Sequence, residues 1–313
     1  MKNSLLENPI WNTLRTDHSH LAEGDDWARR YPHEIGPLAG ITDQSEASYN
    51  SLRSLAGDHP IGLFSLDPID PRGEWTTVRT GRVIQMVRTA TANTPAHKPV
   101  SVPPDGGAPP TPPATASSNP VPEPDHKPVG VPPDTSSNPA PSPNTNPAPT
   151  TPTPTAPSSF AGGSNPSHRH ETCAVLDVPA VELPPDCTFR QLTPADAAAM
   201  VALAELTEPG PFRLRTIELG NFYGIFHGSR LVSMAGKRMH LPGFIEVSGV
   251  CTHPDFRGLG YAGALTWIIM DEIEQSGRTP FLHAWEGNPA RRLYESLGFT
   301  LTRTFNMSVL AAA

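Results

Sequence analysis

The sequence predicts an α/β fold with a mixed sheet for residues 187–313, and three observations support this prediction. Short apolar and β-branched runs alternate with stretches of helical character, as strands alternate with helices in α/β domains. Gly and Pro separate most of these runs, where they favour turns and helix ends. One apolar run, 244–252, leads into a glycine-rich turn and then into an apolar helix. The predicted order is strand, helix, three strands, helix, strand, helix and strand.

The first half of this domain begins with a strand at 189–192. Thr193 suits a helix N-cap and Pro194 the first helical position, so we expect a helix from there to about residue 206. The other elements expected in this half are a short helix near 216–220 and two strands, 222–227 and 231–239, joined by a turn at 228–230.

The second half completes the domain with three strands and two helices. Gly277 and Gly298 follow the two helices, where glycine commonly ends a helix. Asn288 suits the N-cap of the second helix. The elements expected here are strands at 244–252, 281–285 and 300–309 and helices at about 260–276 and 289–297.

Composition predicts a linker and a second globular segment. The chain has 313 residues, of which 39 are Pro, and 22 of these lie within 93–159. That tract has no Leu, Ile, Met, aromatic residue or Cys, so it buries too little apolar surface to offset the entropy lost on ordering. We therefore expect a disordered linker at 93–165, between an N-terminal α+β lobe at 1–92 and the domain at 187–313.

The lobe and the linker carry weaker signals. In the lobe, 45–55 predicts a helix, and 61–64 and 83–87 predict short strands. The linker contains a repeat, since 97–105 recurs at 126–134. A semi-rigid spacer is the favoured interpretation, and a ligand for an SH3-like partner is the alternative.

Several classes of protein are not indicated. A net charge of −8 does not suggest a nucleic-acid surface. No apolar run is long enough for a signal peptide or a membrane span, so we expect a soluble, cytoplasmic protein without membrane contact.

The histidine pairs His18/His20 and His168/His170 lack further ligands at metal-binding spacing, which predicts surface histidines and no metal. The cysteines show no redox or zinc spacing and predict free thiols; they are Cys173, Cys187 and Cys251.

The segment 250–262 carries the strongest functional signal. It joins a strand to a helix N-terminus, where amides without intrahelical acceptors and the helix dipole favour an anion. Gly258 and Gly260 let a ligand approach the backbone closely, and Arg257 adds a planar cation. This pattern predicts a pyrophosphate site. No Lys-Ser or Lys-Thr pair completes a Walker A loop. Gly258, Gly260 and Gly263 match the G-x-G-x-x-G spacing of a Rossmann fingerprint, so the glycines alone do not identify the pyrophosphate ligand.

Two motifs in this region resemble one family. The segment 257–262 (RGLGYA) is similar to the R/Q-x-x-G-x-G/A signature of the GCN5-related N-acetyltransferases (GNAT), and 293–299 (LYESLGF) is similar to their L-Y-x-x-x-G-F element. The C-terminal domain thus resembles a GNAT domain of the FR47-like bacterial type. The resemblance implies an N-acetyltransferase that moves acetyl from acetyl-CoA directly to a primary amine of a small molecule or peptide. The residues it assigns to acetyl-CoA are Val250, Cys251, Thr252, Arg257, Gly258, Leu259, Gly260, Tyr261 and Ala262.

The resemblance also implies a role for the lobe and for the strand at 244–252. An N-terminal lobe in such enzymes can be a degenerate second copy of the catalytic fold. Residues 1–92 hold no R-x-x-G-x-G/A equivalent, so such a copy would not bind acetyl-CoA. The strand is expected to bulge and to separate from its neighbour, which frees the main chain of 250–252 for pantetheine and the acetyl carbonyl.

Two side chains are candidates for catalysis. Tyr294 can protonate the departing thiolate, and the alternative is a core aromatic residue. Glu246 lies four residues before Val250, where histone-type members carry a glutamate; we predict a base acting through water, and the alternative is a carboxylate with no catalytic role. Weaker candidates for the base are Glu218, His253 and His283.

Several residues near the site have a structural role as the alternative to a catalytic one. We expect His253 to belong to the turn and His283 to be a buried histidine within a strand. Asn288 is one residue too close to the helix for the usual pantetheine contact and is expected to act as an N-cap. No partner pattern surrounds Cys251, so direct transfer is preferred to an acyl-enzyme. Two other functions stay open, a non-catalytic acyl-CoA sensor and an adaptor acting through the Pro-rich tract. The acceptor amine is not encoded in any motif.

Overall fold

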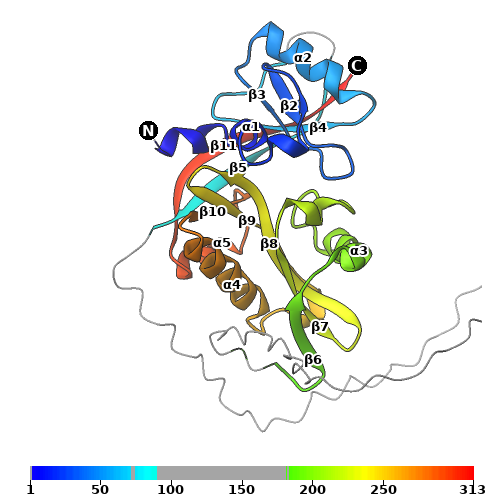
Figure 1. Ribbon diagram of the computed structural model, residues 1–313, viewed down its shortest axis with the longest axis vertical. Helices are drawn as coiled ribbons and strands as arrows, with labels where there is room; N and C mark the ends of the chain where they lie inside the picture. Colours follow the sequence, from blue (N-terminus) through cyan, green and yellow to red (C-terminus); the bar gives the residue numbers. More distant parts are fainter. Residues whose placement is uncertain (1, 72–74, 90–180, 182) are drawn as a thin grey trace, which may run out of the picture. The chain divides into compact units, whose positions relative to one another are not determined.

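An eight-stranded mixed sheet forms the centre of the fold (Figure 1). The computed structural model describes residues 2–71, 75–89, 181 and 183–313; the predicted linker, His168, His170 and Cys173 lie outside them. The strand order is β4-β11-β5-β10-β9-β8-β7-β6. Every neighbouring pair is antiparallel except β9 and β10, which are parallel, so the predicted mixed α/β fold is confirmed.

The C-terminal domain follows the predicted order of elements. Helix α3 begins after a 3-10 turn in which Thr193 and Asp196 form a capping box, as the Thr-Pro start led us to expect. The helix predicted near 216–220 is the 3-10 helix η4. The elements are β6 (Cys187–Gln191), η3 (Pro194–Asp196), α3 (Ala197–Thr207), η4 (Thr216–Leu219), β7 (Phe222–His227), β8 (Arg230–Leu241), β9 (Phe244–Thr252), η5 (Pro254–Phe256), α4 (Tyr261–Gln275), β10 (Thr279–Trp285), α5 (Arg291–Ser296) and β11 (Phe299–Ala312).

The N-terminal lobe is small and irregular. Its helices α1 (Pro9–Arg15) and α2 (Glu46–Ala56) pack with a three-stranded antiparallel sheet, β1-β2-β3. No second unit of strand, glycine turn and long helix occurs in its described residues. Its other elements are η1 (Lys2–Glu7), η2 (Ser19–Leu21), β1 (Glu23–Gly24), β2 (Ala28–Arg30), β3 (Ala39–Ile41), β4 (Ile61–Ser65) and β5 (Trp75–Arg88).

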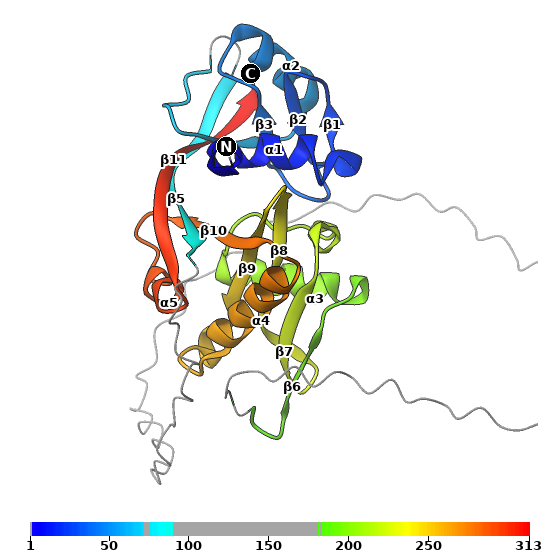
Figure 2. The same ribbon diagram turned by 60° about the vertical axis from the view of Figure 1, so that its left-hand side comes forward.

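The strands predicted at 61–64 and 83–87 exist as β4 and β5, but they belong to the large sheet. Figure 2 shows β5 between β10 and β11, and it is antiparallel to both. Strand β4 pairs with the far edge of β11. The sequence did not indicate this arrangement, because β5 and β11 are more than 200 residues apart in the chain. The sequence of neither strand identifies the strand with which it pairs. Residues 1–92 and 187–313 therefore share one sheet.

The two faces of the sheet near β9 are covered differently. Side chains alternate along a strand, so Ile245 and Val247 face one side and Phe244 and Glu246 the other. The first pair packs in a core with α4, and Leu265 of α4 is fully buried there. On the opposite side, the lobe packs against the sheet in a second core, which contains Leu6, Ile10, Leu14, Tyr31, Met239, Leu241, Phe244 and Phe281.

One prediction for the lobe is wrong. His18 is not a surface residue, because the turn after α1 buries its ring against Tyr31 and His240. Its Nδ1 lies 2.9 Å from the Tyr31 hydroxyl. His20 is exposed, as predicted. No group of three or more His, Cys, Asp or Glu in the described residues is arranged to hold a metal, and no described helix is long and apolar enough to cross a membrane.

Candidate active site

The site lies where β9 and β10 separate. The two strands pair only at their beginnings, where 244–246 of β9 lie opposite 279–281 of β10. In the described residues they form no further pairs, although β9 continues to Thr252 and β10 continues to Trp285, paired with β5. The edge of β9 that faces away from β8 is therefore left without a strand partner. Backbone groups on such an edge are free to bind a ligand.

A bulge in β9 marks the point of separation. Gly236 of β8 lies opposite Ser248 and Met234 lies opposite Cys251, so two residues of β9 face the single Ala235. Gly249, one of the two, has φ of +64°, a conformation that favours glycine. The bulge changes the direction in which the following residues, 250–252, present their main chain.

The turn after β9 forms an open cradle at the N-terminus of α4. Gly258 and Gly260 both have φ of +81°, and no atom lies within 4 Å of a Cβ placed at Gly258. The amides of Tyr261, Ala262 and Gly263 occupy the first helical turn and have no intrahelical acceptor. This cradle offers several backbone donors to an anion beside the free edge of β9.

Side chains of the cradle differ in their accessibility. Arg257 is exposed, and its Nε donates to the Thr252 carbonyl at 3.3 Å, which holds the guanidinium over the end of β9. Leu259 is half exposed. Tyr261 is 2% exposed, and its hydroxyl lies 3.7 Å from Cys187 Sγ, so it contributes its amide to the cradle and its ring to the core.

Tyr294 lies beside the end of β9. Its ring is 7% exposed and meets Phe299 edge-on, with 6.2 Å between ring centroids. Burial raises the pKa of Tyr294 to about 12, and the neighbouring Cys251 thiol contributes to the rise. Such a hydroxyl stays protonated at neutral pH, which a general acid requires. Burial also raises the pKa of Cys251 to about 11, against a hydrogen bond with Thr207 that lowers it, so the thiol is not an activated nucleophile.

Glu246 is held in a buried ion pair. Its side chain is fully buried, and its two oxygens accept hydrogen bonds from Arg238 Nε at 2.8 Å and Nη2 at 2.7 Å. His283 Nδ1 lies 2.7 Å from Oε1. Burial alone would raise the pKa of Glu246, but the Arg238 charge and the hydrogen bonds from Arg238 and His283 lower it to about 2. A carboxylate with this pKa and no exposed oxygen is a poor proton acceptor, which argues against the role of base that we predicted.

The weaker candidates also have structural partners. Both carboxylate oxygens of Glu218 accept hydrogen bonds from Arg215. His253 lies in the turn, as predicted, and its Nδ1 accepts from the Asp255 amide at 3.2 Å. The side chain of His283 is 2% exposed and lies between Glu246 and Gln85. The amide of Ala290 donates to Asn288 Oδ1 at 2.9 Å, so Asn288 stabilises the turn before α5.

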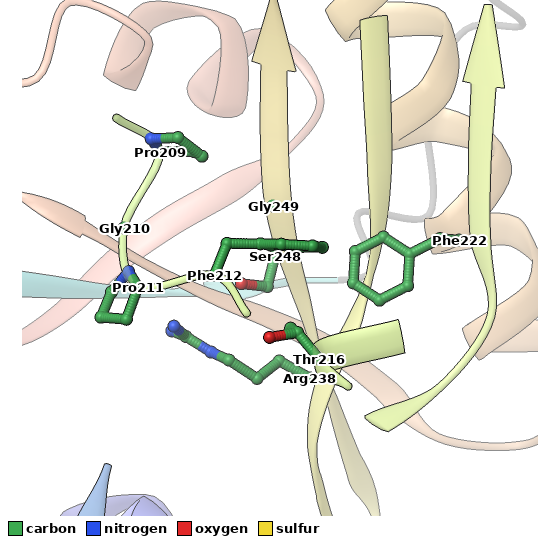
Figure 3. A pocket seen from close by; sticks show the side chains of 9 residues that line it. All are labelled: Pro209, Gly210, Pro211, Phe212, Thr216, Phe222, Arg238, Ser248 and Gly249. Atoms are coloured by element: carbon green, nitrogen blue, oxygen red, sulfur yellow. The ribbon is translucent and has the colours of Figure 1, made fainter. Parts of the chain in front are cut away.

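A pocket opens on the lobe side of β9, directly before the bulge (Figure 3). Arg238 extends below Ser248 toward Pro211, and the loop before η4 forms the opposite wall. Arg238 was not among the predicted site residues, because strand alternation alone does not reveal which side chains meet across β8, β9 and β10. The residues that line the pocket are Pro209, Gly210, Pro211, Phe212, Thr216, Phe222, Arg238, Ser248 and Gly249.

Comparison with known proteins agrees with this geometry. Residues 222–307 match the family model described as FR47-like protein, a segment that begins at β7 and ends within β11. This segment is an FR47-like domain with the GNAT fold. The resemblance seen in the two motifs is thereby confirmed, and acyl transfer is the general activity that the family supports.

One solved structure is similar to this protein over nearly the whole chain, and others are similar over part of it. A GNAT-family protein from Novosphingobium aromaticivorans is 27% identical, with a TM-score of 0.63 over 98% of each chain. A GCN5-related N-acetyltransferase-like protein from Streptococcus suis is 21% identical, with a TM-score of 0.33 over 42% of this chain and 53% of its own. A Mycobacterium tuberculosis protein in complex with CoA is 17% identical, with a TM-score of 0.32 over 36% of this chain and 71% of its own. A search of curated proteins gave no match.

Proposed function

We propose that this protein transfers an acetyl group from acetyl-CoA directly to a primary amine. The observation that carries the proposal is the separation of β9 from β10 beside the open glycine turn of α4. The free edge of β9 at 250–252 suits the amide groups of pantetheine. The first-turn amides of α4 and Arg257 suit the pyrophosphate, because together they provide backbone donors, a dipole and a cation.

The proposed reaction needs one acid and one route for a proton. The amine nitrogen attacks the thioester carbon, so that a C–N bond forms while the C–S bond breaks. Tyr294 donates its proton to the departing sulfur, and the main chain of 250–252 holds the carbonyl oxygen. The nitrogen loses one proton to solvent, which in turn restores the Tyr294 hydroxyl. The products are the acetylated amine and the CoA thiol.

The proton of the amine most simply leaves through water. None of the described residues that line the pocket is Asp, Glu or His, and Glu246 has no accessible oxygen. We therefore assign Glu246 the role of holding Arg238, in place of the predicted base. The rate should then follow the pKa of the acceptor amine instead of that of an enzyme carboxylate.

A thiol-release assay with a broad panel of amines tests the proposal. Tyr294→Phe should lower kcat by about 10²-fold or more while the KM for acetyl-CoA changes little, because only protonation of the thiolate is removed. Tyr49→Phe, in α2 of the lobe, removes a hydroxyl that donates to Gln44 and is the matched control. If acetyl-CoA binds but no amine releases thiol, the proposal fails and the chain is a non-catalytic acyl-CoA sensor.

A further inference from the structure

The pocket beside Ser248 is placed to hold the acceptor. Ser248 and Gly249 directly precede the residues, 250–252, whose main chain faces the predicted thioester. A second depression adjoins it on the side of the lobe, and the two share Pro211, Thr216 and Arg238. A molecule lying over Arg238 is therefore within reach of both the free edge of β9 and the lobe. This inference rests on the proposed function.

Arg238 presents unused hydrogen-bond donors to this pocket. Its Nε and Nη2 donate to Glu246, whereas Nη1 donates to no described residue. The side chain is 11% exposed, and it lines both this pocket (Figure 3) and the adjoining depression. Guanidinium groups remain charged under all ordinary conditions and are well suited to bind carboxylate or carbonyl oxygens.

A row of buried polar groups fixes Arg238 from behind. Glu246 on β9 and His283 on β10 lie 2.7 Å apart, and Gln85 on β5 lies 3.1 Å from His283 Nε2. Gln85 Nε2 also donates to the Leu6 carbonyl of the lobe at 3.1 Å. The row crosses four neighbouring strands, so the guanidinium is held in one orientation before any ligand binds. Such preorganisation lowers the entropy lost on binding.

The rest of the pocket selects for an apolar group. Four of its nine lining residues are apolar rings, Phe212, Phe222 and the two prolines Pro209 and Pro211. The Thr216 hydroxyl is already used, since it accepts from the Arg213 amide and donates to the Ile35 carbonyl, each at 2.7 Å. With no acidic side chain among the lining residues, the pocket offers nothing to pair with a second positive charge. A polyamine or aminoglycoside would lose hydration there without compensation.

We propose that the acceptor is an α-aminoacyl group with an apolar side chain, whose carboxylate or carbonyl oxygen binds Arg238 and whose side chain packs on Phe212 and Phe222. The α-amino group then points toward β9 at 250–252. A free apolar amino acid and the N-terminal residue of a peptide share this chemistry. Arg238 is thus a specificity-determining residue of the acceptor site.

The test compares acceptors that differ in one feature. L-Phenylalanine and phenylalanylglycine carry the oxygen, phenethylamine lacks it, and spermidine carries additional charge in its place. Wild type should have a kcat/KM for phenylalanine or phenylalanylglycine about 10- to 100-fold above that for phenethylamine, since a hydrogen bond to a charged group is lost. A preference for the free amino acid over the dipeptide identifies the carboxylate as the ligand, and the reverse identifies the carbonyl. Equal or better use of phenethylamine or spermidine overturns the inference while leaving the proposed function intact.

A binding measurement separates this inference from catalysis. N-Acetyl-L-phenylalanine, the expected product, should bind wild type in isothermal titration calorimetry, and Arg238→Lys should weaken binding about 10-fold or more. Arg53→Lys, on α2 of the lobe, is the matched control, and thermal unfolding checks that each variant folds. If Arg238→Lys does not fold, Ser248→Ala, which removes a hydroxyl of the same pocket, takes its place with an expected loss of a few fold. Unchanged binding in a folded variant contradicts the assignment, whereas binding without turnover retains it and rejects the proposed function.

Discussion

Replacing Glu246 by Gln separates a structural ion pair from a catalytic base. In the folded protein the pKa of Glu246 is about 2, against an ordinary value of 4.5, because Arg238 and His283 stabilise the carboxylate more than burial destabilises it. A difference of about 2.5 pKa units corresponds to roughly 3 kcal/mol of stability at neutral pH. Glu246→Gln leaves Arg238 charged and buried without its partner, which costs about 3–5 kcal/mol.

The contribution of Glu246 to the free energy of unfolding depends on pH with a definite sign. Since the folded pKa is below the unfolded value, the contribution of Glu246 is fully present above pH 4.5 and is lost as the pH falls toward 2. Urea denaturation at pH 7 should show the full decrease in the free energy of unfolding of Glu246→Gln. The difference in unfolding free energy between wild type and this variant should become smaller as the pH falls below 4.5. Glu218→Gln removes an exposed carboxylate paired with Arg215 and should cost less than about 1 kcal/mol.

The enzymatic assay of the same variant decides between the two roles. If Glu246 holds Arg238, Glu246→Gln raises the KM for the acceptor and keeps the wild-type shape of the pH–rate profile. A variant as stable as wild type that loses kcat, together with the acidic limb of that profile, would show that Glu246 is the base and that our reasoning from burial is wrong.

Three further predictions address the cradle, the thiol and the lobe. Gly260→Val should raise the KM for acetyl-CoA about 10-fold or more in steady-state assays. A φ of +81° is unfavourable for valine and so distorts the turn, and the added side chain occupies space at the cradle. An unchanged KM would place acetyl-CoA elsewhere. Cys251→Ala should keep kcat within about threefold, since a buried thiol with a raised pKa is not a nucleophile; trapping of an acetyl-cysteine would contradict direct transfer. Burial and the neighbouring His240 lower the pKa of His18 to about 3. Since His18 takes up a proton more readily in the unfolded chain, it should lower the free energy of unfolding by about 2 kcal/mol between pH 7 and pH 5. His18→Gln should reduce that pH dependence in thermal unfolding, and an unchanged dependence would mean that His18 does not contribute.

The elements near the cradle were predictable because their signals are local. A Thr-Pro helix start, glycines after helices and a strand that ends in a glycine turn each act over a few residues of sequence. The bulge in β9 was expected only through the family resemblance, and the structure contains it at Gly249.

The features that the sequence did not reveal depend on distant partners. Strand β5 lies in the sheet between β10 and β11. No pattern in the sequence of 75–88 predicts these two neighbours. The role that we propose for Glu246 differs from the predicted base for the same reason, because Arg238 and His283 reach it from two other strands. His18 was predicted to be exposed since its burial against Tyr31 and His240 requires the lobe to pack on β8.

The most direct test of the central claim is a crystal structure of the protein with acetyl-CoA or CoA. We expect the pyrophosphate on the amides of 258–263, pantetheine along the free edge of β9 at 250–252, and the sulfur within hydrogen-bonding distance of the Tyr294 hydroxyl. A nucleotide bound outside the opening between β9 and β10, or a sulfur directed away from Tyr294, would contradict it.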